Sequence, residues 1–597
     1  MAINSTDEAD LVVLGATPGG ITSAIAAARL SKTSLLIERT PFIGGLPANG
    51  LGATDIATRG ATGGLFLEFV QRIKAHYIAV YGVNSDQARD CDDGYHFEPS
   101  VAEHVFHQWL LEYPQIKVLT KRQFDFEPEN VEQRAGAIVS ISVTNLETTM
   151  VETIRGRFFL DATYEGDLIA AAGVPFFLGR EGQDVYGELG AGRLYKLWNG
   201  PECSGSTHCG DNAVQAYNYR LCVTDDPENR VKIQRPAKYD REEFISLVHD
   251  VTTGLHTGAD VLDISEEQMA ENLKRAEQNQ PPIQDKLGGI RRLLSNVTLP
   301  NRKVDGNNQH LALISTDLPE ENWPYPTSSW AWRDSFAKRL REYTEGLLYF
   351  AQNDPELPGW FREECRRWGW AADEYIENGH FPRQLYVREG RRMKGKYVFT
   401  ANDVPVRNIT KQLEGADGVT DQKKGIPDAV GEIAKSVQSL GHSDSITASH
   451  YALDSHAVRK REPGRVHLDG FFSYRCSPYY VPYGVMVPDA PVTNLLAPVP
   501  VSATHVGFST LRMEPCWMAL GQAAGVAAAF CLDAGVAAEE VDINKVQREL
   551  LNQGAVLIYD PRLWEDGTSH EAREAMQWRW LQSAKGVNEQ PTKKQRD

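Results

Sequence analysis

The chain has 597 residues, of which 42% are hydrophobic and 24% are charged, a balance typical of folded globular proteins. The 62 basic and 80 acidic side chains give a formal net charge of -18. This composition excludes a disordered, collagen-like or coiled-coil chain. It also disfavours a nucleic-acid partner, because binding to a phosphate backbone needs clustered cations. No stretch approaches the ~20 apolar residues that span a bilayer, so no membrane partner is expected.

The N-terminal segment MAINSTDEAD is polar and acidic, without the basic and apolar regions of a secretory signal. The eight cysteines are sparse and form no CxxC pair, which favours a reducing compartment. We therefore expect a cytoplasmic protein. Cys203, His208 and Cys209 lie close together, but no fourth ligand is evident, so no metal site is expected.

A strand, a glycine turn and a helix are predicted near the N-terminus. Leu11 to Leu14 is a short apolar run, Gly15-Ala16-Thr17-Pro18-Gly19-Gly20 has the composition of a tight turn, and Ile21 to Leu30 is rich in alanine. This is the context that a dinucleotide-binding fingerprint requires. Helix N-terminal amides can then bind a pyrophosphate. Thr17 stands where the simple pattern has its second glycine, and its hydroxyl could donate a hydrogen bond there instead.

A second short strand, Ser34 to Ile37, ends in Glu38, which lies 23 residues after Gly15. An acid at this point accepts hydrogen bonds from a ribose diol, which disfavours NADP. Arg39 follows, and the paired Gly44 and Gly45 would let the backbone pass close to a flat ring system.

Two later regions repeat the pattern of an apolar run followed by small residues, Arg157 to Val174 and Asn494 to Phe530. If all three regions form one sheet, that domain is discontinuous and the middle of the chain is a large insertion. The middle is richer in bulky aromatic residues. Within it, Asp334 to Phe350 has the periodicity of an amphipathic helix, and Lys411 to Lys424 is expected to be an exposed loop.

The last of these regions predicts a strand at Leu495 to Val499 and a helix at Met513 to Phe530. Gly521 and Gly525 weaken that helix by about 1 kcal/mol each relative to alanine, so a close approach of a cofactor or of another helix is expected there. No second nucleotide fingerprint follows a buried strand, which disfavours a pyridine-nucleotide reductase.

The segment ADLVVLGATPGGITSAIAAARL, followed by LLIERTPFIGG, resembles the FAD-dependent oxidoreductase family that begins with G-x-T-P-x-G and continues with E-x5-GG. Thr17 is a trait of that family. The resemblance extends to FFLDATYEGDLIAAAGVPFFLGRE, GHFPRQLYVREGRRMKGKYVFTANDV and SATHVGFSTLRMEPCWMALGQAAGVAAA, and it covers most of residues 10 to 555. The family is broad, so the match does not indicate a substrate.

The resemblance implies an α/β fold in which a discontinuous Rossmann-like FAD-binding domain carries a large inserted α+β substrate domain. We place the FAD domain at 8-178 and 481-560, the substrate domain at 179-480, and a C-terminal extension at 561-597. The implied cofactor is FAD. Its binding residues would be Gly15, Thr17, Pro18, Gly19, Gly20, Glu38, Arg39, Gly44, Gly45, Asn49, Gly50, Asp161, Ala162, Thr163, Gly521, Gln522 and Gly525.

Three polar clusters are candidates for catalysis. His505 and Arg512 flank the predicted turn before the last helix, and His505 is our first choice for a general base or a residue that orients the substrate. Arg391, with Arg388 and Arg392, could recognise an anion or could be neutralised by Glu389. The third cluster is Asp454-Ser455-His456, in which His456 is expected to line or brace the substrate cavity.

The function expected from these residues is a dehydrogenase or oxidase that takes a hydride from a small organic substrate onto flavin. A flavin monooxygenase and a non-redox FAD-binding protein are the alternatives. The substrate, the electron acceptor, a covalent flavin bond and assembly into a homo-oligomer are left open.

Overall fold

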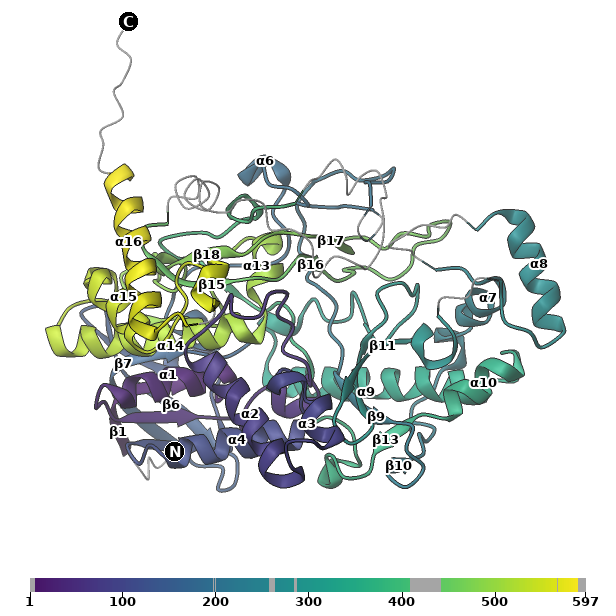
Figure 1. Ribbon diagram of the computed structural model, residues 1–597, viewed down its shortest axis with the longest axis horizontal. Coiled ribbons are helices and arrows are strands. Elements are labelled where there is room, and N and C mark those ends of the chain that lie inside the picture. The colour runs from purple at the N-terminus through teal and green to yellow at the C-terminus, as the bar shows by residue number, and fades with distance from the viewer. Residues whose placement is uncertain are drawn as a thin grey trace, which may run out of the picture.

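The computed structural model describes residues 6–196, 198, 200–256, 264–283, 287–407, 442–565 and 567–588. Figure 1 shows the N-terminal segments in purple beside the C-terminal helices in yellow-green, at one end of the long axis. Segments from the middle of the chain, in teal, form the other end. The two ends of the sequence therefore build one part of the molecule together.

The main sheet has the strand order β3-β2-β1-β7-β6-β4, with β19 paired to β7 and β5 paired to β6. Strands β3, β2, β1, β7 and β19 are parallel, while β6, β5 and β4 continue the sheet in antiparallel pairs. The bounds are β1 Thr6–Leu14, β2 Ser34–Ile37, β3 Ile116–Leu119, β4 Arg122–Gln123, β5 Val131–Arg134, β6 Ala137–Asn145, β7 Val151–Asp161 and β19 Leu495–Leu496. The mixed α/β fold and the first two predicted strands are confirmed.

The chain leaves β1 toward β2 on one side, while β7 pairs with β1 on the other side. In open α/β sheets, ligands bind in the crevice where the strand order reverses in this way. Here that crevice lies at the carboxyl ends of β1 and β7, which place Leu14 beside Asp161. Strand β19, which comes from near the C-terminus, pairs with Phe159 and Leu160 at the same end of β7.

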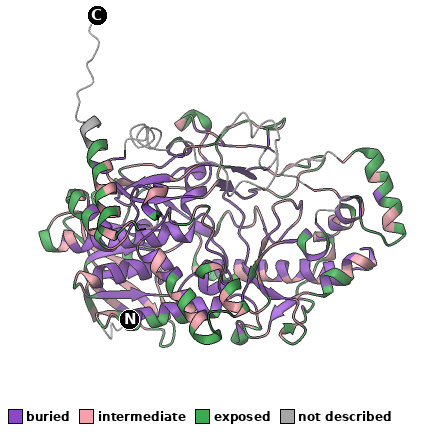
Figure 2. Ribbon diagram, viewed as in Figure 1, coloured by how far each residue is buried: buried purple, intermediate pink, exposed green. Residues whose placement is uncertain are grey.

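Helix α1 (Pro18–Arg29) follows β1, and α14 (Glu514–Ala534) packs along it. The residues of α14 are almost all buried. Figure 2 shows buried residues, in purple, at the centre of the part of the molecule that contains α1 and α14. By length and composition α14 is the one helix of the described residues that could cross a membrane, yet 89% of its apolar window is buried inside the protein. This burial is what a core helix requires, because its partners here are α1, α2 and the sheet.

A second, five-stranded antiparallel sheet has the order β10-β13-β9-β12-β11. Its strands are β9 Leu221–Thr224, β10 Arg230–Val231, β11 Leu294–Leu299, β12 Lys303–Asn308 and β13 Gly369–Ala371. Beside it lies α9 (Trp330–Asn353), which contains the amphipathic helix predicted at Asp334 to Phe350 (Figure 1). Its apolar face meets aromatic residues such as Phe244 and Tyr217.

Three two-stranded sheets connect these parts: β8 (Phe176–Phe177) with β14 (Arg392–Met393), β15 (Ser445–Ser449) with β18 (Tyr479–Pro482), and β16 (Leu453–Ser455) with β17 (Phe472–Tyr474). The other helices are α2 Leu65–Tyr81, α3 Asp86–Asp90, α4 Pro99–Leu111, α5 Asp167–Ala171, α6 Gln183–Tyr186, α7 Ser246–Thr253, α8 Glu266–Glu277, α10 Gly359–Arg366, α13 His505–Leu511, α15 Ile543–Asn552 and α16 His570–Asn588.

The turn predicted between the last strand and the last helix is wrong, because the seven-residue helix α13 lies there, capped by Thr504, whose hydroxyl accepts a hydrogen bond from the amide of Gly507. The loop predicted at Lys411 to Lys424 lies outside the described residues.

Candidate cofactor and active site

The glycine turn after β1 is held against the end of β7. Gly15 has φ +98°, and a Cβ there would lie 2.7 Å from the carbonyl oxygen of Ala162, so both conformation and space require glycine. The hydroxyl of Thr17 donates to that same oxygen at 2.8 Å and accepts from the amide of Gly20 at 3.2 Å. Thr17 therefore caps α1 and fixes the turn to β7, so its hydroxyl is already occupied within the protein.

The first turn of α1 begins with Pro18, which suits the first helical position because it has no amide hydrogen to leave unpaired. Gly20 packs so closely that a Cβ would lie 3.2 Å from Ala162 Cβ and still nearer to Gly15 O. The amide of Gly19 has no intrahelical partner at this position. This buried N-terminus, at the carboxyl end of the sheet, has the donors and the dipole that bind a pyrophosphate.

Glu38 comes directly after β2, and its carboxylate accepts hydrogen bonds from the amides of Ala16 at 3.1 Å and Thr40 at 2.9 Å. The acid predicted to bind a ribose therefore lies against the glycine turn. Arg39 points elsewhere. Its guanidinium pairs with Asp334 at 2.6 Å and lies 4.2 Å from the centre of the Trp330 ring, so it fastens this segment to α9.

The segment with the paired glycines folds back over the start of α1. The amide of Gly44 donates to Ala16 O at 2.8 Å. A Cβ at Gly45 would lie 2.8 Å from Pro18 Cδ and closer still to the Tyr164 hydroxyl. Asn49 donates to Gly45 O at 2.8 Å, while its own Oδ1 is buried without a hydrogen-bond partner. Gly50 packs against Arg220, where a Cβ would lie 3.0 Å from the Arg220 Cβ.

Asp161, Ala162 and Thr163 form the end of β7 and the turn after it. Asp161 accepts from the Thr163 hydroxyl at 2.6 Å and from the amide of Ile169 at 3.0 Å. Burial raises the pKa of Asp161 to about 6, although these hydrogen bonds lower it. The side chain thus shapes the turn that carries Tyr164 toward α1.

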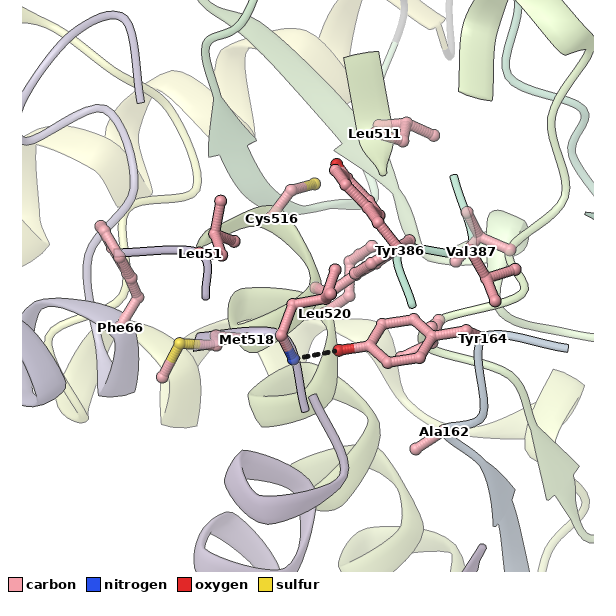
Figure 3. Packing of buried hydrophobic residues seen from close by; sticks show 14 of the residues in the cluster. Leu51, Phe66, Ala162, Tyr164, Tyr386, Val387, Leu511, Cys516, Met518 and Leu520 are labelled. Carbon is pink, nitrogen blue, oxygen red and sulfur yellow. Dashed lines mark hydrogen bonds between the residues drawn. The ribbon is translucent and has the colours of Figure 1, made fainter. Parts of the chain in front are cut away.

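Tyr164 and Glu514 form a buried pair that the sequence did not single out. The amide of Leu46 donates to the Tyr164 hydroxyl at 3.2 Å, drawn as the dashed line in Figure 3, and this hydroxyl donates to Glu514 Oε1 at 2.5 Å. Glu514 is the first residue of α14. Burial raises the pKa of Glu514 to about 8, although the hydrogen bond from Tyr164 lowers it.

The region where the start of α1 meets Asn49, Tyr164 and Glu514 fits FAD for two reasons. It has buried polar atoms without a partner among the described residues, and it has hydrogen-bond donors at the start of α1. Three buried atoms have no hydrogen-bond partner: Oε2 of Glu514, Nε1 of Trp517 and Oδ1 of Asn49. Such atoms cost free energy unless a ligand satisfies them. A flavin nucleotide has both donors and acceptors on its ring edge and an anionic pyrophosphate for the N-terminus of α1.

The glycines of α14, the helix predicted at Met513 to Phe530, pack against α1. A Cβ at Gly521 would lie 2.5 Å from Thr22 Oγ1 and nearer to Gly19 O, and one at Gly525 would lie 3.0 Å from Ala26 Cβ and nearer to Ser23 O. Gln522 accepts a hydrogen bond from the amide of Leu65 at 2.9 Å at the start of α2. The sequence predicted that either a cofactor or another helix approaches these glycines. In the structure the neighbour is the helix α1.

The three arginines of the second cluster are each paired with a different acid. Arg388 binds Asp317 at 2.8 Å, Arg391 binds Asp167 at 2.6 Å, and Arg392 binds Glu181 and Glu389, both at 3.0 Å. Each arginine therefore has a carboxylate partner within the protein, although Arg391 shares Asp167 with Arg333. For Arg391 the partner is Asp167 and not the sequence neighbour Glu389, because the segment turns across α5.

His505, the first residue of α13, lies between an acid and a hydroxyl. Its Nδ1 is 2.8 Å from Glu389 Oε2, and its Nε2 is 3.2 Å from Ser455 Oγ. All three side chains are buried. Burial alone would raise the pKa of Glu389, but its contacts with His505 and Arg392 hold it below its usual value. An ionised Glu389 fixes the proton on Nδ1, which leaves Nε2 as the acceptor.

Arg512 is the C-cap residue of α13. It contacts β16, the short strand that also contains Ser455. It donates to the Tyr386 hydroxyl at 2.7 Å and to the carbonyl oxygen of Asp454 at 2.9 Å. Tyr386 lies near Tyr164 in the packed cluster of Figure 3, which joins this part of the site to the region around Tyr164 and Glu514 described above. His456 is bound to Asp317 at 2.8 Å, yet burial and Arg388 lower its pKa to about 3, so it is neutral.

The fold thus brings together His505, Arg512 and the Asp454 cluster, which the sequence presented as separate groups. Glu389, Tyr386, Tyr164 and Glu514 are the additional residues of this site. A signal for Glu389 existed, since it is an acid within a run of arginines, but the sequence favoured those arginines as its partners. Within the described parts of the chain, no group of three or more His, Cys, Asp or Glu side chains could hold a metal.

A parallel sheet with a glycine turn at its reversal point defines a dinucleotide-binding α/β protein. A family model described as FAD dependent oxidoreductase matches residues 10–550. The chain therefore belongs to the FAD dependent oxidoreductase family, which makes it a flavoenzyme of the oxidoreductase class with FAD as its cofactor. No curated protein matches it.

Among solved structures, it is similar in part to three proteins. The anhydrotetracycline hydroxylase OxyS from Streptomyces rimosus shares 16% identity over 30% of this chain and 36% of its own, with a TM-score of 0.20. The glycerol-3-phosphate dehydrogenase from Bacillus halodurans, complexed with FAD, shares 10% over 29% and 38%, with a TM-score of 0.21. Thioredoxin reductase from T. acidophilum shares 14% over 26% and 34%, with a TM-score of 0.16. The match thus spans little more than a third of each of these chains.

Proposed function

We propose that this enzyme is a dehydrogenase or oxidase that takes a hydride from a small organic substrate. The observation that supports this proposal is the buried series Ser455–His505–Glu389, a proton acceptor that lies beside Tyr386 and Arg512. When bound, FAD supplies the acceptor for the hydride. The discontinuous domain at 8-178 and 481-560, with its insertion, is part of the same proposal, and the pairing of β19 with β7 supports it.

The protein residues have three tasks in this proposal. The start of α1, with Gly15, Gly19 and Gly20, binds the pyrophosphate, and Glu38 orients the nucleotide ribose. Glu389 keeps the proton of His505 on Nδ1, so Nε2 accepts a proton through the Ser455 hydroxyl, 3.2 Å away. Because Ser455, His505 and Glu389 are buried, water is excluded from that transfer, and Tyr386, Val387 and Leu511 belong to the packed apolar cluster of Figure 3.

The experiment is anaerobic bleaching of the bound flavin by a metabolite library. In wild type, at least one compound is expected to bleach it. In His505→Gln, FAD content is expected to be unchanged, while the bleaching rate falls by about 10²- to 10⁴-fold, the usual contribution of a general base. His450→Gln is the control, since His450 is another buried histidine, bound to Thr58 and to Cys476 O.

Two results would count against the proposal. Equal bleaching rates in wild type and His505→Gln would remove His505 as the proton acceptor. A flavin that no reductant in the library bleaches, in a protein that dithionite does bleach, would remove substrate oxidation as the function.

A further inference from the structure

Arg512 differs from six other buried arginines of the described chain in having no acidic partner. Those six all form ion pairs with carboxylates: Arg180, Arg220, Arg333, Arg388, Arg391 and Arg392. Among the residues that the structure describes, no carboxylate oxygen lies within 4.0 Å of the Arg512 guanidinium. Arg512 is nevertheless 2% exposed.

The hydrogen bonds of Arg512 use only part of its donors. One terminal nitrogen donates to the Tyr386 hydroxyl and the other donates to Asp454 O, both neutral acceptors. Its Nε is buried without a partner. Asp454 and Asp55 contribute favourable charge interactions to Arg512, but among the described residues neither forms a direct ion pair with it. An anion that reaches the guanidinium therefore gains both a direct ion pair and the unused donor.

Asp454, whose carbonyl oxygen binds Arg512, also has a side-chain acceptor without a partner among the described residues. Asp454 is 8% exposed, its Oδ2 accepts from the Tyr451 hydroxyl at 3.3 Å, and its Oδ1 has no hydrogen-bond partner. The next residue is Ser455, which contacts His505. A ligand at this point therefore meets a guanidinium, a carboxylate that accepts a hydrogen bond, and the proton acceptor.

We infer that the substrate is a small carboxylic acid that carries a hydroxyl or amino group close to its carboxylate. The carboxylate binds Arg512, and the hydroxyl or amino group donates to Asp454. This inference rests on the proposed function, because it assigns the substrate class of the same site. A phosphate is disfavoured, since its second negative charge would meet the carboxylate of Asp454. Arg388, Arg391 and Arg392 are less suited to the substrate, because each already forms a direct ion pair with a protein carboxylate.

The test is a binding comparison on the FAD-loaded enzyme with matched pairs of ligands. Each pair is a small hydroxy acid or amino acid and its primary amide, with the corresponding unsubstituted acid as a third ligand. Binding is measured from the flavin difference spectrum and the shift in melting temperature. In wild type, the best acid is expected to bind about 10- to 100-fold more tightly than its amide, the size of a hydrogen bond to a charged group. The set of ligands that binds more tightly, hydroxy acids or amino acids, identifies the second group of the substrate.

Variants assign the effect to the two residues. Arg512→Met is expected to lose the preference for acid over amide, and Asp454→Asn is expected to lose the preference for substituted over unsubstituted acids. Arg333→Lys is the matched control, because Arg333 is equally buried but already paired with Asp167. The wild-type comparison stands without any variant, so a misfolded Arg512→Met leaves the test intact.

The outcomes separate this inference from the proposed function. Equal binding of acids and amides, or tighter binding of phosphate esters, overturns the carboxylate assignment. Bleaching by uncharged alcohols or amines alone also overturns it, while the proposed oxidation stands. Tight binding of acids that never bleach the flavin supports the Arg512 site and counts against the proposed function.

Discussion

The contact between α1 and α14 supports the cofactor site, and Gly521→Ala tests it directly. Gly521 lies against the first turns of α1, where a Cβ would be 2.5 Å from Thr22 Oγ1 and still closer to the backbone oxygen of Gly19. The Thr22 hydroxyl also donates to Met518 O at 2.8 Å and so joins the two helices. A single methyl group at position 521 therefore meets both a backbone atom, which cannot rotate away, and a hydrogen bond between the helices.

The expected magnitude follows from opposing effects. Alanine is the better helix former by about 1 kcal/mol. Overpacking a tight interface costs about 1–3 kcal/mol, and weakening the Thr22 hydrogen bond costs about 1 kcal/mol more. We expect a net loss of about 1–3 kcal/mol. Because we propose that Gly19 belongs to the turn that binds the pyrophosphate, moving α1 is also expected to lower the affinity for FAD.

The assay compares melting temperature and the FAD dissociation constant in wild type, Gly521→Ala and Gly288→Ala. The control adds the same methyl at a glycine where no atom lies within 4 Å of the new Cβ. Gly521→Ala is expected to melt several degrees lower and to bind FAD more weakly, while Gly288→Ala resembles wild type. If Gly521→Ala matched wild type in both measurements, the close contact of the two helices would be refuted.

Three further predictions concern other parts of the site and the core. Gly15→Val is expected to purify without colour, because Gly15 has φ +98° and faces Ala162 O; a yellow preparation with one FAD per chain would contradict the phosphate assignment. Burial raises the pKa of Glu514 from 4.5 to about 8, so the folded apoprotein binds a proton that the unfolded chain has released. Stability should therefore fall by up to about 1.4 kcal/mol per unit as the pH rises from 5 to 8, and Glu514→Gln should flatten that fall in apoprotein melting curves; an unchanged slope would show that Glu514 is ionised. Lys303→Met leaves Glu98 and Glu374 buried without their cation, at 2.6 and 3.0 Å in wild type; a loss of about 3–5 kcal/mol is expected in denaturant unfolding, and wild-type stability would show that these acids are protonated.

Local sequence was sufficient for the first strand, the glycine turn, the first helix and the second strand. Each depends on residues close in the chain: Gly15 for its positive φ, Pro18 for the first helical position and an apolar run for each buried strand. The turn expected before the last helix was wrong for a related reason. Thr504 caps α13 through Gly507, a signal as local as the cap of α1, but the predicted helix start at Met513 obscured it.

Partner choice among the buried charges could not be predicted, because it depends on contacts between distant segments. Glu389 does pair with Arg392, as the sequence allowed, but it also binds His505, 116 residues later, while its neighbour Arg388 binds Asp317. Likewise Tyr164 meets Glu514 only because the end of β7 faces the start of α14. Sequence patterns identified the polar clusters, but only the tertiary pairing shows which charges are neutralised.

That pairing also changes which arginine is available for substrate. From the sequence, the run of Arg388, Arg391 and Arg392 could recognise an anion or be neutralised by Glu389, and Arg512 was a candidate beside His505. In the folded protein the run is neutralised by acids, whereas Arg512 has a phenol and a main-chain carbonyl as partners. A buried cation that forms no direct ion pair is tolerated where function needs it, since a partner in direct contact would make it more stable. Arg512 lies two residues before Glu514 and contacts β16, so it joins the proposed substrate position to the proposed cofactor position.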